Sequence, residues 1–162
     1  MERCCFTQGA AVGGAAPLAR TPLTEDRPQT VVGDTNIFIA LLSGPAHLFH
    51  EDALAIFRRV AEGHLAVVLT AVVVAELAYV AGPVLGWSRN AAASGLTRLL
   101  MADGIVVSER DTLVAAMELY AGHAKLDFAD AYVAATALRA DHAVATFDRG
   151  LEAVTGLEVL ST

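Results

Sequence analysis

The stretch Leu65-Ala-Val-Val-Leu-Thr-Ala-Val-Val-Val-Ala-Glu-Leu77 decides the fold class, because a short apolar run leads directly into a helical pattern. Its first five residues are all apolar, which predicts a buried strand over residues 66–69. Thr70 is then a suitable N-cap for a helix over residues 71–80. A strand that leads directly into a helix is the repeating unit of α/β proteins, whose parallel strands are apolar on both faces.

The same region also has the length of a membrane span, since residues 65–87 contain a single charged residue, Glu76. A carboxylate near the middle of a span is costly, and Gly82-Pro83 interrupts the helix that a span requires. We therefore interpret this region as a strand and a helix of an α/β domain rather than as a membrane span.

Apolar runs and helical patterns alternate along most of the chain. Strands are expected over residues 31–34, 66–69, 105–107 and 143–147, with a fifth over 157–160. Helices are expected over residues 37–42, 51–62, 71–80, 88–101, 112–121 and 127–140. This order predicts a three-layer α/β/α fold with a central parallel sheet of four to five strands, in one domain over residues 30–162. Residues 1–29 lack a period and are rich in Gly, Ala, Pro and Thr, so we expect a flexible N-terminal extension there.

Composition excludes several classes of protein. With 55% hydrophobic and 18% charged residues, the 162-residue chain is too apolar to be intrinsically disordered. Its net charge of −7 excludes a protein that coats nucleic acid by non-specific charge attraction. Cys4 and Cys5 are adjacent, which suits neither an ordinary disulfide nor a zinc site, so we expect a reducing, cytoplasmic location.

Four acidic residues are predicted to converge at one edge of the sheet. Asp34 closes the first expected strand and Asp148 follows the fourth, while Asp130 lies in the first turn of the helix that precedes the fourth strand. Glu76 lies on the helix after the second strand, and its helical neighbours are apolar, which predicts a buried carboxylate. Ligands of open α/β sheets bind beyond the carboxyl ends of the strands, so this edge is the expected site.

Asp127 and Asp130 are three residues apart at the start of one helix. Asp127 is expected to be the N-cap of that helix, whereas Asp130 is expected to be a ligand. Clustered like charges destabilise a fold unless a cation neutralises them, and oxygen-only ligands favour Mg²⁺ or Mn²⁺ over Zn²⁺. We expect Asp34 and Asp130 to be the principal metal ligands, with Glu76 and Asp148 completing the site.

The chain resembles the PIN-domain family, and within it the VapC-like toxin ribonucleases of toxin–antitoxin systems. The resemblance rests on four motifs that occur in the family's order, namely Val32-Gly-Asp-Thr-Asn-Ile-Phe38, Leu69-Thr-Ala-Val-Val-Val-Ala-Glu-Leu77, Phe128-Ala-Asp-Ala-Tyr-Val-Ala-Ala-Thr-Ala137 and Val144-Ala-Thr-Phe-Asp-Arg149. It implies that Asp34, Glu76, Asp130 and Asp148 form an acidic catalytic quartet. Asn36 and Thr146 match polar positions that support such a quartet.

The resemblance also implies a metal-dependent endoribonuclease in which a metal-activated water attacks the RNA phosphodiester. It implies a cut that leaves a 5′-phosphate, a homodimer, and a small antitoxin protein that blocks the site. Because the net charge opposes RNA binding, local basic residues must hold the substrate. The candidates are Lys125, Arg149, Arg89 and Arg98.

Two other functions stay open at this stage. The first is a phosphohydrolase on another α/β scaffold with Asp34 as nucleophile, although such enzymes want a second Asp two residues later, where this chain has Asn36. The second is a non-catalytic PIN-like module that binds RNA or protein. The five histidines show no metal-ligand spacing and are expected at the surface or in loops, with His50 near the mouth of the site. Tyr79, Trp87 and Tyr120 are expected to fill the core.

Overall fold

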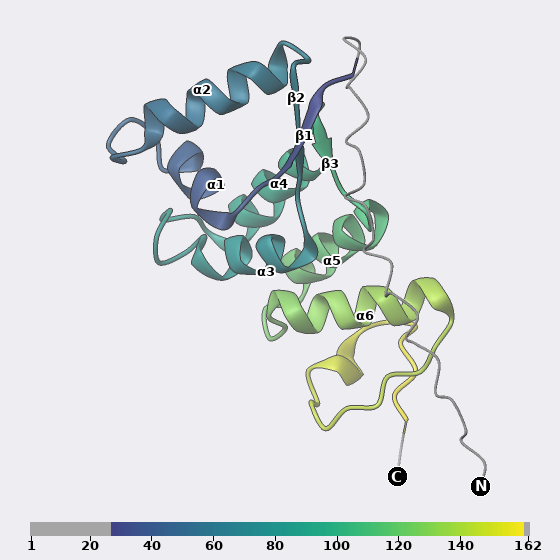
Figure 1. Ribbon diagram of the computed structural model, residues 1–162. Helices are drawn as coiled ribbons and strands as arrows, with labels where there is room; N and C mark the ends of the chain where they lie inside the picture. Colours follow the sequence, from purple (N-terminus) through teal and green to yellow (C-terminus); the bar gives the residue numbers. More distant parts are fainter. Residues whose placement is uncertain (1–26, 161–162) are drawn as a thin grey trace, which may run out of the picture.

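A computed structural model describes residues 27–160 of the chain (Figure 1). Most of the extension expected over residues 1–29 therefore lies outside the described residues.

A parallel three-stranded sheet forms the centre of the fold (Figure 1). Its strands are β1 (Gln29–Val32), β2 (Leu65–Val68) and β3 (Ile105–Val106), in the order β1-β2-β3. Val68 of β2 is in register with Val32 on one side and with Val106 on the other, so the carboxyl ends of all three strands meet at one edge. β2 is the buried central strand, as its unbroken apolar sequence predicts.

Helices cover the sheet and confirm the predicted three-layer α/β/α class. Each expected helix is present within a few residues of its predicted limits. Thr70 caps α3 as predicted, with its hydroxyl accepting from the N–H of Val73 at 3.4 Å. The helices are α1 (Thr35–Leu42), α2 (His50–Ala61), α3 (Ala71–Val80), α4 (Arg89–Leu100), α5 (Arg110–Gly122) and α6 (Phe128–Ala140), followed by a short 3₁₀ turn, Leu151–Ala153.

The predicted fourth and fifth strands are wrong as strands. In the described chain, residues 143–147 and 157–160 share only an isolated bridge between Val144 and Val159. Val144 and Leu157 instead pack in a second core cluster against α6, with Leu126, Leu151 and Val154, whereas Phe147 is 99% exposed. A short apolar run indicates burial, but it does not determine which segment supplies its hydrogen-bond partners. The sheet therefore has three strands in the described residues rather than four to five.

The main core lies between β2 and the helices α3, α4 and α5. Phe38, Val67, Leu77 and Leu113 are each 0% exposed within it. β1 lies at the edge of the sheet and none of its residues is buried, Val32 being 73% exposed, so the expected burial of this strand is wrong. Edge strands receive cover from fewer neighbours than central strands do, and an apolar sequence alone does not distinguish the two positions.

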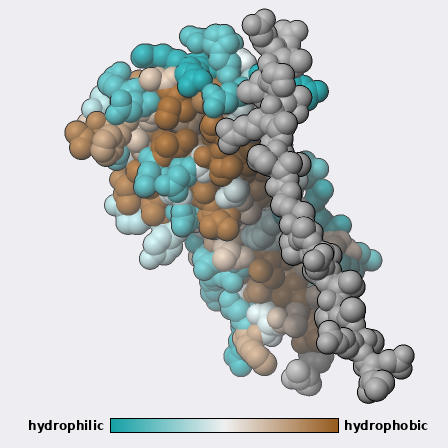
Figure 2. Space-filling view, viewed as in Figure 1, coloured by the Kyte–Doolittle hydropathy of each residue, from teal (hydrophilic) through white to brown (hydrophobic). Residues whose placement is uncertain are grey.

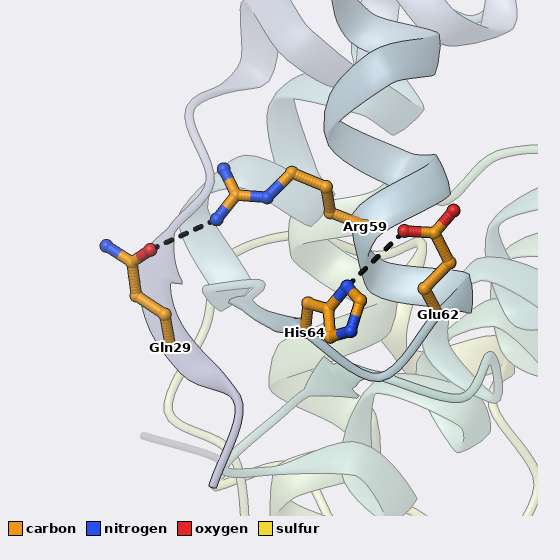
Figure 3. Close-up of polar contacts among 4 residues, drawn as sticks. All are labelled: Gln29, Arg59, Glu62 and His64. Carbon is orange, nitrogen blue, oxygen red and sulfur yellow. Dashed lines mark hydrogen bonds and ion pairs between the residues drawn. The ribbon is translucent and has the colours of Figure 1, made fainter. Parts of the chain in front are cut away.

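The start of β1 is tied to the end of α2 (Figure 3). The Gln29 side-chain oxygen accepts from Nη2 of Arg59 at 3.3 Å. The backbone N–H of Gln29 donates to the carbonyl of His64 at 3.1 Å. His64 in turn lies 3.4 Å from a carboxylate oxygen of Glu62. The first strand thus begins at Gln29, inside the range expected for the extension.

The surface in the view of Figure 2 is largely hydrophilic, with apolar patches between the charged side chains. One apolar tip lies at the α1–α2 connection, where Leu48 and Phe49 are 85% and 57% exposed. Among residues 27–160, every helix is too short or too polar to cross a membrane.

Candidate active site

Asp34 lies at the carboxyl edge of the sheet, two residues after the end of β1. It is the N-cap residue of α1, but its side chain makes no capping bond and instead accepts from the Asn36 amide at 3.1 Å. Gly33 makes this position possible, because a Cβ there would lie 2.7 Å from Val67 and 2.8 Å from the Phe38 ring. The absence of a side chain at Gly33 lets the chain pass directly over the core and leaves the Asp34 carboxylate available to a ligand.

Glu76 is exposed on the outer face of α3, so its predicted burial is wrong. Its helical neighbours Val72 and Tyr79 are 69% and 83% exposed on the same face. α3 is apolar on nearly every side, and a helical period cannot show which side of such a helix the rest of the fold covers. The exposure of Tyr79 also contradicts its expected place in the core.

A hydrogen bond joins α1 and α3 at this face. The hydroxyl of Thr35, a residue only 8% exposed, donates to Oε2 of Glu76. Asp34, Thr35, Asn36 and Glu76 line an open hollow of about 570 Å³, together with Ala75, Tyr79 and Val80. Two of the four predicted acidic residues therefore share one hollow, with an amide and a hydroxyl beside them.

Asp127 and Asp130 form a capping box at the start of α6. The Asp127 side chain accepts from the Asp130 N–H at 2.8 Å, which confirms its predicted role as a cap. The Asp130 side chain accepts from the Asp127 N–H at 3.2 Å. Asp130 thus has a structural role as well, whereas the sequence predicted only a ligand role for it. The spacing of Asp127 and Asp130, three residues apart at a helix start, is the spacing of a capping box and could have revealed this role.

Asp148 lies in an exposed turn, where its Oδ1 accepts from the Gly150 N–H at 2.7 Å. Its own N–H donates to the hydroxyl of Thr146 at 3.0 Å, so Thr146 supports the turn. Burial raises the pKa of the Asp130 carboxyl above its usual value, the Asp127 N–H opposes that rise, and the charges of Asp127 and Asp148 add to it. Asp148 and Asp130 are therefore electrostatic neighbours.

The donor set suits a hard divalent cation. Its groups are four carboxylates with a nearby amide and hydroxyl, and oxygen donors of this kind favour Mg²⁺ or Mn²⁺. Asp34 and Glu76 share one hollow, while the charge of Asp148 acts on the Asp130 carboxyl at the start of α6. Among the residues that the structure describes, no three His, Cys, Asp or Glu side chains are close enough to enclose one ion. The convergence of all four carboxylates stays a prediction.

Two other residues differ from their predicted places. His50 is buried at 9% exposure, and its Nδ1 lies 2.9 Å from the Ala40 carbonyl, so it is a packed residue rather than a surface one. Arg89 differs in part, because its Nη1 is bonded to backbone carbonyls and cannot contact RNA without losing those bonds; its role as an RNA contact stays a prediction. Lys125, Arg149 and Arg98 are exposed, as a contact with RNA requires.

A family model described as the PIN domain matches residues 31–157, which is most of the 162-residue chain. PIN domains are in general metal-dependent nucleases. No curated protein matches the chain significantly, and no solved structure does.

Proposed function

The chain belongs to the PIN-domain family, and from this premise we propose that it is a metal-dependent endoribonuclease. The observation that carries the proposal is the hollow at the carboxyl edge of the sheet, where Asp34 and Glu76 lie with Thr35 and Asn36. This is the edge at which α/β proteins bind ligands. A surface that presents two carboxylates there suits a phosphodiester held through a cation.

The four carboxylates have distinct places in this proposal. Asp34 and Asp130 are the principal ligands of Mg²⁺ or Mn²⁺, and Glu76 and Asp148 complete the site. When bound, such a cation makes water more acidic and neutralises phosphate charge. Asn36 orients the Asp34 carboxylate and Thr35 orients Glu76, because each donates a hydrogen bond to its neighbour.

Asp130 responds to the charges around it. Its pKa is raised by burial and by the charges of Asp127 and Asp148, so its ionised form is disfavoured without a counter-charge. A cation reverses that preference, because an opposite charge favours the ionised carboxylate.

Substrate and partners follow from the VapC-like resemblance and are part of the proposal. The substrate is RNA, held by exposed basic residues such as Lys125 and Arg149 rather than by the overall charge of −7. The protein is the toxin of a toxin–antitoxin pair, acts in the cytoplasm as a homodimer, and is blocked by a small antitoxin. A reading frame for a small protein directly beside this one, whose product copurifies with the chain and inhibits cleavage, is the expected finding.

The test is cleavage of a labelled single-stranded RNA by protein freed of metal and partner, with a DNA of the same sequence beside it. We expect RNA cleavage only when Mg²⁺ or Mn²⁺ is added, and a loss of orders of magnitude in Asp34→Asn. Asp103→Asn is the matched control, since Asp103 is exposed before β3, at the opposite edge of the sheet. Cleavage that persists in a chelator, or RNA binding without cleavage, would refute the proposal.

A further inference from the structure

Arg89, the first residue of α4, inserts its guanidinium into the connection between α5 and α6. Its Nη1 donates to the carbonyls of Tyr120 and Leu126, each at 2.8 Å, and to the carbonyl of His123 at 3.4 Å. The guanidinium carbon also lies 4.0 Å from the centre of the Tyr120 ring. One side chain of α4 thus makes four contacts with a connection more than thirty positions away.

These contacts satisfy groups that the end of a helix leaves without partners. Tyr120 is in the last turn of α5, so its carbonyl lacks a partner in the next turn, whereas the His123 carbonyl also accepts from the Leu126 N–H at 3.1 Å. The carboxyl end of a helix also carries partial negative charge, which a guanidinium complements. Arg89 therefore fixes the backbone from the end of α5 to Leu126.

Leu126 connects this clamp to the acidic residues. It immediately precedes Asp127, the N-cap whose side chain is bonded to Asp130. Its side chain is 0% exposed, and a Cβ placed on Gly150 would lie 3.3 Å from it and 3.1 Å from the Asp148 carboxylate. The Leu126 backbone thus leads to Asp130, while its side chain packs beneath the turn that holds Asp148.

We propose that Arg89 is a positioning residue that sets the place of Asp130, and with it Asp148, by holding the Leu126 peptide. The inference rests on the proposed metal-dependent function and assigns Arg89 to that site's support rather than to RNA binding. The two hydrogens of Nη1 already serve three carbonyls. A contact between Nη1 and RNA phosphates would have to break this arrangement.

Two substitutions of Arg89 separate these roles. Arg89→Met removes every donor but keeps an apolar stem, whereas Arg89→Lys supplies three N–H donors that can reach the same carbonyls. Arg59→Met is the control for loss of a positive charge. Arg59 lies near the amino end of the sheet, where its side chain donates to Gln29. Val60→Ala, a buried residue of α2, is the control for a general loss of stability.

The experiment measures Mn²⁺ binding by calorimetry, together with kcat and KM for RNA cleavage, on folded protein checked by circular dichroism. We expect Arg89→Met to weaken Mn²⁺ binding about 10- to 100-fold, as the loss of a ligand's supporting contact does. Its kcat should fall while KM for RNA stays unchanged. Arg89→Lys should restore most of both values, and Arg59→Met and Val60→Ala should leave Mn²⁺ binding unchanged.

Several results would overturn the inference. Unchanged Mn²⁺ binding in Arg89→Met would do so, as would an equal weakening in Val60→Ala, which would mean that stability alone controls binding. A rise in KM with unchanged kcat would make Arg89 an RNA contact instead. If Arg89→Met does not fold, Arg89→Gln takes its place, and unchanged Mn²⁺ binding in that variant refutes the clamp. If the wild-type protein neither binds Mn²⁺ nor cleaves RNA, that result refutes the proposed function itself rather than the role of Arg89.

Discussion

Asp127 and Asp130 allow a sharp comparison, because they are identical side chains three residues apart that bond to each other's backbone. We predict that Asp127→Asn leaves RNA cleavage nearly intact, whereas Asp130→Asn reduces it by orders of magnitude. An asparagine caps a helix about as well as an aspartate does, so the first change preserves the start of α6. The second change keeps the shape of the side chain but removes the charge that holds a hard cation.

Stability gives the comparison a second, independent measure. Asp127→Asn should change the free energy of unfolding little, while Asp127→Ala removes the cap and should cost about 1 kcal/mol. For a domain of this size that cost lowers Tm by about 3–5 °C. Asp130→Asn can still accept from the Asp127 N–H through its amide oxygen, so the capping box survives.

The sign of the pH effect follows from the raised pKa of Asp130. A carboxyl with a raised pKa binds its proton more tightly in the folded state than in the unfolded state, so ionisation destabilises the fold as the pH rises through that pKa. Without metal, Asp130→Asn should therefore be slightly more stable than wild type at pH 7. The difference should disappear at a pH below the pKa of this carboxyl in both the folded and the unfolded state, where it is neutral in each.

The assay combines cleavage rates with Tm for the three variants and wild type, with and without Mn²⁺, across a pH series. Normal cleavage by Asp130→Asn together with inactive Asp127→Asn would reverse the assignment. Full cleavage activity in both Asp127→Asn and Asp130→Asn would mean that α6 does not contribute to the active site. A lower Tm for Asp130→Asn at pH 7 without metal would refute the electrostatic argument even if cleavage fell.

Three further outcomes are expected. Mn²⁺ at 100 times its dissociation constant should stabilise the folded protein by about 2.7 kcal/mol, and an unchanged Tm at millimolar ion would contradict a metal site. Deletion of residues 1–26 should leave Tm nearly unchanged, since the sequence there lacks apolar periodicity. Deletion through Gln29 also removes the bond to Arg59 and should lower Tm. Equal effects of the two deletions on Tm would argue against this boundary. Phe38→Ala should cost about 3–5 kcal/mol in chemical denaturation, and Tyr79→Ala, 83% exposed, should stay within about 0.5 kcal/mol.

Features that depend on neighbouring residues were predictable from the sequence. The helices, the buried β2 strand, the Thr70 cap and the Asp127 cap all follow from patterns within a few positions, and the structure confirms each of them. The order of strands and helices also sufficed for the three-layer class. Signals within a few positions set the limits and the apolar faces of these elements, and packing against distant segments then stabilises them.

Features that depend on distant segments were not predictable in the same way. The exposure of Glu76 depends on which side of α3 the rest of the fold covers, and an apolar helix carries no signal of that choice. The pairing of Val144 with Val159 instead of with the sheet is likewise a choice between partners. The clamp formed by Arg89 joins residues more than thirty positions apart, and a sequence pattern shows only an arginine at the start of a helix.

The reciprocal bonds between Asp127 and Asp130 also have a kinetic consequence. Helix ends fray on their own, but here fraying of the first turn of α6 must break both bonds together and carry the Asp130 carboxylate away. If Asp130 holds a cation, release of the ion and opening of this turn become parts of one event. Amide protons in the first turn should then exchange with solvent more slowly as the ion concentration rises, while those at the other end of α6 keep their rate.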